Sequence, residues 1–193
     1  MKYDEGNRQL ARLREQISAI RSDMREVLAA MEPRPVDEHV FDTLEGPVAL
    51  TALFGRRDEL IVIHNMGSNC AYCTLWADGY NGLYPHLKRR AAFVVASPDP
   101  PQRQAEFARE RGWRFPMVSD RGATFAAKMG YATADGHCRP GLSVLQRHSG
   151  RLLRVVDTAS CPHDDFCALW HLFDLLPGGA AGWRPTLNGK ADE

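Results

Sequence analysis

The stretch LIVIHNMGSNCAYC, residues 60–73, decides the fold of this chain. It begins with four consecutive apolar residues, a pattern typical of a strand that is buried on both faces of a sheet. A helical pattern starts where the stretch ends, over about residues 70–87. The stretch therefore predicts a buried strand, a short connection and a helix whose first turn carries Cys70 and Cys73.

The rest of the chain continues this alternation of strands and helices. After Pro140 the pattern changes to an antiparallel hairpin followed by a final helix. The expected elements are strands at 39–43, 92–96, 115–118, 142–145 and 152–156, a helical turn at 49–54, and helices at 100–110, 124–129 and 164–176. This order predicts an α/β fold, a thioredoxin-like three-layer sandwich with a mixed central sheet, with a strand and a helix added in front.

A long amphipathic helix is expected before this domain, over residues 7–31. Its apolar residues alternate in steps of three and four, which is a heptad pattern. They are Leu10, Leu13, Ile17, Ile20, Met24, Val27 and Met31. The helix either pairs with the same helix of a second subunit or lies on its own domain. The expected organisation is a dimerisation or docking helix (1–35), a thioredoxin-like domain (36–185) and a tail (186–193).

Charge and composition exclude several classes of protein. The 193 residues include 24 Lys and Arg against 24 Asp and Glu, whereas nucleic-acid-binding proteins normally carry a basic excess or stripe. No apolar run reaches the ~18–20 residues needed to cross a bilayer, and the polar N-terminus lacks the apolar core of a signal peptide. We therefore expect a cytoplasmic protein with no nucleic-acid or membrane partner. Nothing in the sequence indicates a bound cofactor.

Five cysteines in a reducing compartment argue against a structural disulfide framework. At a helix N-terminus, the Cys-x-x-Cys spacing brings two sulfurs within bonding range, and the unpaired N–H groups and the helix dipole favour a thiolate. Cys70 is then the expected nucleophile, and Cys73 the resolving thiol that displaces a mixed disulfide. The alternatives are metal binding by the pair and two ordinary buried cysteines.

Further motifs accompany the cysteine pair. They are Asp58-Glu59-Leu60-Ile61-Val62, Trp76-Ala77-Asp78-Gly79, Asn81-Gly82, Gly112-Trp113-Arg114-Phe115-Pro116, Trp170-His171-Leu172-Phe173-Asp174-Leu175-Leu176-Pro177 and Trp183-Arg184-Pro185. With these motifs, the chain from about residue 53 to 183 resembles a bacterial family of thioredoxin-like proteins, described as predicted dithiol–disulfide oxidoreductases without an established substrate. The resemblance implies a thioredoxin-like fold and redox use of Cys70 and Cys73. Ala71 and Thr74 depart from the proline and serine that the family often has there, so no redox direction is implied.

Two further residues are expected near the cysteine pair by comparison with the thioredoxin fold. In that fold a cis-proline opens the first hairpin strand beside the cysteines, and Pro140 occupies this place. The alternatives are an ordinary trans proline, or Pro116 in this role. His64 lies six residues before Cys70, where thioredoxins have a buried acid that acts on the proton of the resolving thiol. The alternative for His64 is a polar group that is hydrogen-bonded within the core.

The other three cysteines follow or precede strands that are expected to end near the pair. Cys138 comes just before the hairpin and Cys161 just after it, so both are expected at the same rim. His163 and Cys167 are close enough in sequence to join them. Such a cluster would suit disulfide relay or a zinc or iron–sulfur site, and unrelated or buried thiols are the alternative.

Three classes of function fit these patterns. The first is a thiol–disulfide oxidoreductase that acts on a protein or small-molecule disulfide. The second is a thiol peroxidase, which usually has Thr or Ser three residues before its reactive cysteine, where this chain has Gly67. The third is a non-enzymatic metal-binding or interaction module that dimerises through the N-terminal helix.

Overall fold

The computed structural model describes residues 1–133 and 135–187, and the chain divides into two compact units, residues 1–34 and 35–193. The first unit consists mainly of helix α1 (Tyr3–Ala30), in which no residue is buried. Of the predicted tail, residues 188–193 lie outside the described residues. In the part of the chain that the structure describes, no helix is long and apolar enough to span a membrane.

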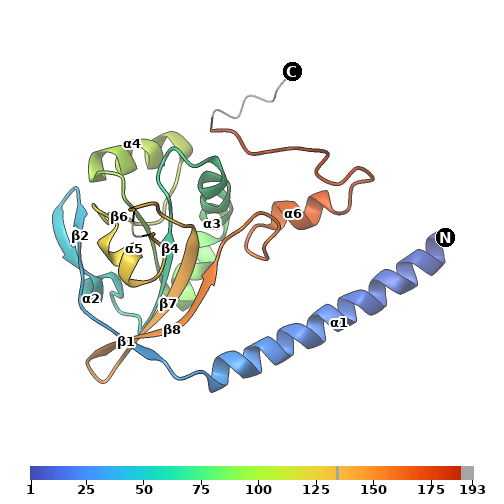
Figure 1. Cartoon of the computed structure of the whole chain (residues 1–193), viewed down its shortest axis with the longest axis horizontal. Coiled ribbons are helices and arrows are strands. Elements are labelled where there is room, and N and C mark those ends of the chain that lie inside the picture. Colours follow the sequence, from blue (N-terminus) through green and yellow to red (C-terminus); the bar gives the residue numbers. More distant parts are fainter. Residues whose placement is uncertain (134, 188–193) are drawn as a thin grey trace. The chain divides into compact units, whose positions relative to one another are not determined.

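The second unit is built on a mixed sheet of eight strands, in the order β1-β8-β7-β4-β5-β6-β2-β3. Figure 1 shows β7 between β8 and β4 in this sheet. The strands are β1 (Arg34–Val36), β2 (Val40–Thr43), β3 (Gly46–Ala49), β4 (Glu59–His64), β5 (Ala92–Ser97), β6 (Met117–Ser119), β7 (Gly141–His148) and β8 (Arg151–Ala159). The helices are α2 (Leu50–Leu53), α3 (Ala71–Arg90), α4 (Pro101–Arg111), α5 (Thr124–Lys128) and α6 (Ala168–Phe173).

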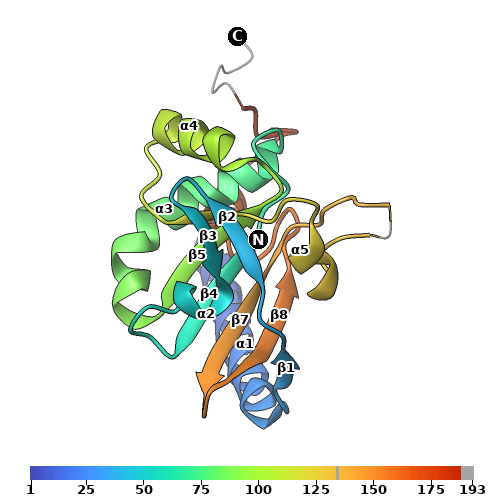
Figure 2. The ribbon, with the colours of Figure 1, turned by 90° about the vertical axis from the view of Figure 1, so that its left-hand side faces the viewer.

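Strand β4 occupies the centre of this sheet. It pairs in parallel with β5, where Ile63 faces Val95, and antiparallel with β7, where Ile63 faces Leu142. Strands β7 and β8 form the hairpin predicted after Pro140 (Figure 2). The predicted thioredoxin-like α/β fold with a mixed central sheet is therefore confirmed.

The two faces of the sheet carry two separate hydrophobic clusters, because successive side chains of a strand point to opposite faces. Leu60 and Val62 belong to the cluster that includes Phe54 and Phe125, next to α2 and α5. Ile63 belongs to the other cluster, which contains residues of α3, α4 and α6. The cysteine-bearing helix α3 thus covers the face of β4 to which Ile63 points.

The structure differs from the sequence prediction at three elements. Strand β1, beside β8, and strand β3, which pairs antiparallel with β2, were not expected. Helix α6 is shorter than the predicted helix 164–176 because the Asp164 carboxylate accepts hydrogen bonds from the backbone N–H groups of Cys161 and Phe166, at 3.2 and 2.9 Å. Side-chain bonds of this kind compete with helical ones and hold the segment as a loop.

Candidate active site

Cys70 is the N-terminal cap of α3. Its backbone is extended, with φ −96° and ψ 105°, and its sulfur accepts a hydrogen bond from the Cys73 backbone N–H at 3.2 Å. A cap of this kind satisfies an N–H group that has no partner within the helix. The Cys70 carbonyl accepts bonds from the Thr74 backbone N–H at 3.0 Å and from the Thr74 hydroxyl at 2.9 Å. These bonds hold the Cys70 sulfur at the mouth of the helix.

The two thiols differ in burial, and both are free of disulfides. Cys70 is half-buried, whereas the side chain of Cys73 is 3% exposed. The outer sulfur is therefore accessible to a substrate, and the inner one lies beneath it.

The two thiols also differ in acidity. A hydrogen bond from the Cys73 thiol is the main reason why the pKa of Cys70 falls to about 6, while burial opposes this shift and the backbone N–H groups of Cys73 and Tyr72 add to it. The same hydrogen bond, followed by burial, raises the pKa of Cys73 well above its ordinary value. At neutral pH Cys70 is mostly a thiolate and Cys73 a thiol, which are the forms that a nucleophile and a resolving thiol need.

The loop between β4 and α3 is held from both sides. The Asn65 side-chain oxygen accepts a hydrogen bond from the Gly67 N–H at 2.7 Å, and the Asp99 carboxylate accepts one from the Ser68 N–H at 2.6 Å. Gly67 has φ +106°, and a Cβ atom there would lie 3.0 Å from Asp99 Oδ1. Glycine is therefore required at this position for its backbone conformation as well as for space.

A small cavity lies beside the inner thiol. It is lined by Ile63, His64, Asn65, Cys73, Trp76, Tyr80, Pro140 and Ser160. The structure thus brings Pro140 close to Cys73 through the start of the β7–β8 hairpin.

The peptide bond before Pro140 is trans, as are all peptide bonds of the described residues. The prediction of a cis bond at Pro140 is therefore wrong. Arg139 donates its backbone N–H to the Tyr131 carbonyl at 2.7 Å, and the Pro140 carbonyl accepts from the Ser160 N–H at 3.0 Å. These two bonds fix the backbone on either side of Pro140, so that the chain continues directly into β7. The trans isomer fits this path and is intrinsically favoured by about 0.5–1 kcal/mol.

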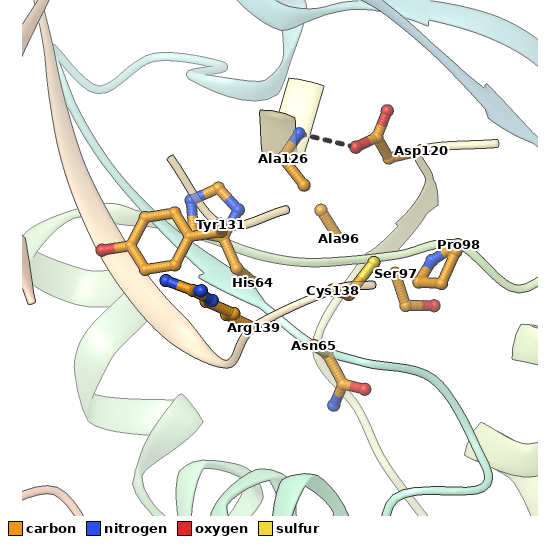
Figure 3. Close-up of a pocket in the computed structure, with 10 residues that line it drawn as sticks. All are labelled: His64, Asn65, Ala96, Ser97, Pro98, Asp120, Ala126, Tyr131, Cys138 and Arg139. Carbon is orange, nitrogen blue, oxygen red and sulfur yellow. Dashed lines mark hydrogen bonds between the residues drawn. The ribbon is translucent and has the colours of Figure 1, made fainter. Parts of the chain in front are cut away.

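His64 does not direct its ring toward Cys73. The ring stacks on Tyr131, with 4.0 Å between centroids (Figure 3), and its Nε2 is 2.9 Å from the Ser143 hydroxyl. Burial, together with the charge of Arg154, lowers the pKa of His64 to about 3. His64 is therefore a neutral, hydrogen-bonded core residue, and the expectation that it acts on the resolving thiol is not met by this geometry.

The other three cysteines lie in three different settings. Cys138 is half-buried in a pocket that it shares with Asp120 and Arg139 (Figure 3). Cys161 is exposed, and Cys167 is buried at the start of α6. No group of three or more His, Cys, Asp or Glu side chains within the described ranges is arranged to hold a metal ion.

A family model described as "Bacterial protein of unknown function (DUF899)" matches residues 5–186. The chain belongs to this family. A search of curated proteins gives no match.

Solved structures show which fold this family member has. It is similar to peroxidoxin BcpB from Mycobacterium tuberculosis, with 22% identity, a TM-score of 0.59 and coverage of 70% of this chain and 88% of that one. It is also similar to peroxiredoxin Q from Xanthomonas campestris, with 17% identity, a TM-score of 0.54 and coverage of 64% and 80%. A third similar structure is a candidate protein disulfide isomerase from Bacteroides thetaiotaomicron, with 21% identity, a TM-score of 0.51 and coverage of 65% of this chain and 77% of that one. At these identities the likeness establishes the thioredoxin-like fold.

Sequence reasoning missed Tyr80, which lines the cavity beside the inner thiol of this family member. Tyr80 lies seven residues after Cys73 on the buried face of α3, so helical spacing was a signal that could have found it. Ser160 also lines this cavity, at the end of the hairpin that was expected to reach this rim.

Proposed function

We propose that this protein is a thiol–disulfide oxidoreductase in which Cys70 is the nucleophile and Cys73 the resolving thiol. The observation that carries the proposal is the hydrogen-bonded pair of thiols at the N-terminus of α3, one accessible and acidic, the other buried and protonated. A pair of structural cysteines in a core would not need this division of properties.

The reaction follows from the two sulfurs. The Cys70 thiolate attacks one sulfur of a substrate disulfide, forms a mixed disulfide and releases the first substrate thiolate. The Cys73 thiol then loses its proton and attacks the Cys70 sulfur, which releases the second substrate thiolate and leaves a Cys70–Cys73 disulfide. The substrate gains two electrons, and the cysteine pair loses them. A pKa near 6 suits Cys70 in the first step, because it makes this residue a thiolate, the attacking form, at neutral pH.

Single substitutions test this assignment. We expect Cys70→Ser to abolish reduction of a model aromatic disulfide and Cys73→Ser to trap a mixed disulfide on Cys70 that intact-mass measurement detects. Cys167→Ser serves as the control because it also removes a buried thiol, on α6 instead of α3. Equal turnover in the wild type and both active-site variants would refute the proposal.

A thiol peroxidase is the second candidate, because two of the similar solved structures are peroxiredoxins. Peroxide reduction would begin with attack of the same Cys70 thiolate on a peroxide oxygen. Gly67 stands where such enzymes usually have Thr or Ser, and a Cβ atom there would bring a strained backbone and a tight contact with the Asp99 carboxylate. We therefore expect the disulfide to be reduced much faster than hydrogen peroxide; the reverse order of rates would favour the peroxidase.

A further inference from the structure

The hydroxyl of Tyr80 is a buried polar group without a hydrogen-bond partner among the described residues. The side chain is 7% exposed, and its ring packs edge-on against Phe93 of β5, with 5.8 Å between centroids. A buried hydroxyl that makes no hydrogen bond costs roughly 1–3 kcal/mol. Such a group in a native structure calls for a functional explanation or an ordered water.

The Tyr80 side chain lines the same cavity as the Cys73 thiol. Cys73 and Tyr80 are two turns apart on the buried face of α3, and long helical side chains lean toward the helix N-terminus. This lean carries the hydroxyl of Tyr80 back toward the turn that bears Cys73. The space corresponds to about one water molecule, and Asn65 and Ser160 add polar groups to its wall.

We propose that this cavity holds a water molecule between the Tyr80 hydroxyl and the Cys73 sulfur, and that this water takes the proton from Cys73 when the mixed disulfide is resolved. The inference rests on the proposed function and names the group that serves its second step. Tyr80 is a positioning residue, because its hydroxyl binds the water. Once the Cys73 thiolate has formed, the hydroxyl donates a hydrogen bond to the water, and the water donates one to the thiolate.

The need for such a group arises only in the second step. In the reduced protein the Cys73 thiol donates its hydrogen bond to the Cys70 thiolate. Once Cys70 is part of a mixed disulfide, that acceptor has no charge, and Cys73 must lose its proton inside the protein. The water accepts this proton and passes it outward past Ser160, which is partly exposed. The Cys73 thiolate then forms the Cys70–Cys73 bond, and the departing substrate thiolate takes up a proton from solvent.

The other titratable groups around the cavity do not replace Tyr80. His64 on β4 turns its ring to the opposite face of the sheet. Asp164 and Cys167, in the segment that leads into α6, do not line the cavity. Burial above all, and then the charges of Asp164, Cys167 and Cys73, raises the pKa of Tyr80. The Tyr80 hydroxyl therefore keeps its proton at neutral pH and can serve as a hydrogen-bond donor.

The test separates the two steps on the full-length chain. Cys138 and Cys161 are replaced by serine because they are the other accessible thiols. Mixing with an excess of an aromatic disulfide such as dithionitrobenzoate releases one coloured thiolate when Cys70 attacks and a second when Cys73 resolves the mixed disulfide. Stopped-flow absorbance records both rates over a range of pH.

In this background we expect Tyr80→Phe to slow the second release by about 10- to 100-fold, the effect of losing one hydrogen bond to a charged group. The pH midpoint of the second step should rise, while the rate and pH midpoint of the first step stay unchanged. Tyr84→Phe is the matched control, because Tyr84 also contacts Phe93 but does not line the cavity. Thermal unfolding should show Tyr80→Phe to be no less stable than its parent, which excludes a folding defect.

Each result has one meaning. A second release at the parental rate and pH midpoint in Tyr80→Phe overturns the role of Tyr80, while the dithiol mechanism stands. Equal slowing of both releases also overturns it, since that indicates a general disturbance of α3. If no first release depends on Cys70, the proposed function itself fails.

Discussion

The indole N–H of Trp113 donates a hydrogen bond of 2.8 Å to the carboxylate of Asp78. Asp78 belongs to α3, and Trp113 is the second residue after the end of α4. The same carboxylate is paired with the guanidinium of Arg111. The bond links two of the motifs on which the family resemblance rests. At least these two motif residues therefore hold α3 in place and take no part in the thiol chemistry.

Asp78→Ala should therefore act on stability. Trp113 is buried, and the substitution removes the acceptor of its N–H. We expect the free energy of unfolding to fall by about 1–3 kcal/mol, the cost of an unsatisfied buried donor. Urea denaturation measures this, with the exposed Asp37→Ala as control. A loss of disulfide turnover without a loss of stability would contradict this role.

The acidity of Cys70 depends mainly on the thiol beneath it. We predict that the rate of Cys70 alkylation rises with pH around a midpoint near 6 and that Cys73→Ala moves this midpoint upward. The sign follows because a hydrogen bond to the thiolate stabilises the charged form, and its removal makes deprotonation harder. Iodoacetamide labelling, followed by peptide mass spectrometry, measures the midpoint. An unchanged midpoint in Cys73→Ala would show that the backbone N–H groups alone set the acidity.

Gly67 is predicted to accept a side chain only at a cost in stability. Gly67→Ala combines a strained backbone with a close contact to Asp99, and we expect a loss of about 1–3 kcal/mol in the free energy of unfolding. Gly46→Ala is the matched control, since Gly46 has φ +113° and nothing within 4 Å of the added Cβ. Similar losses in both variants would mean that the contact with Asp99 has no energetic weight.

The position of His64 predicts a structural role. His64→Ala removes a ring that stacks on Tyr131 and bonds to Ser143, and we expect about 2–4 kcal/mol of destabilisation. Resolution of the mixed disulfide, measured well below the unfolding temperature, should keep its rate and pH midpoint. A shifted midpoint would restore a catalytic role for this histidine.

The heptad pattern of the N-terminal helix predicts a homodimer. Its apolar stripe is exposed in α1, where Ile17 and Ile20 are 49% and 58% exposed, and heptad stripes of this kind pair helices. We propose that a second copy covers it. Light scattering after size exclusion should give twice the mass of the chain, and half of that for Ile17→Asp with Ile20→Asp. Arg14→Asp, placed beside the stripe, tests whether any new charge has this effect. A monomeric wild type would disprove the dimer.

Several elements of the fold and the position of the cysteine pair could be predicted from the sequence, because they depend on residues that are close together along the chain. The apolar run 60–63, the spacing of Cys70 and Cys73 and the hairpin after Pro140 are local patterns, and each one formed the element that it predicted. The spacing of two cysteines on one helix turn also specifies which sulfur caps the helix, since only the first can lie outside it.

The surroundings of the pair were decided by tertiary structure. The alternation along β4 places His64 and Ile63 on opposite faces, but only packing determines that α3 covers the face of Ile63. The trans bond before Pro140, the carboxylate of Asp99 against Gly67 and the Tyr80 hydroxyl in the cavity all depend on segments that meet across the sheet. Sequence periodicity describes one segment at a time, whereas the environment of a buried proton is formed by several.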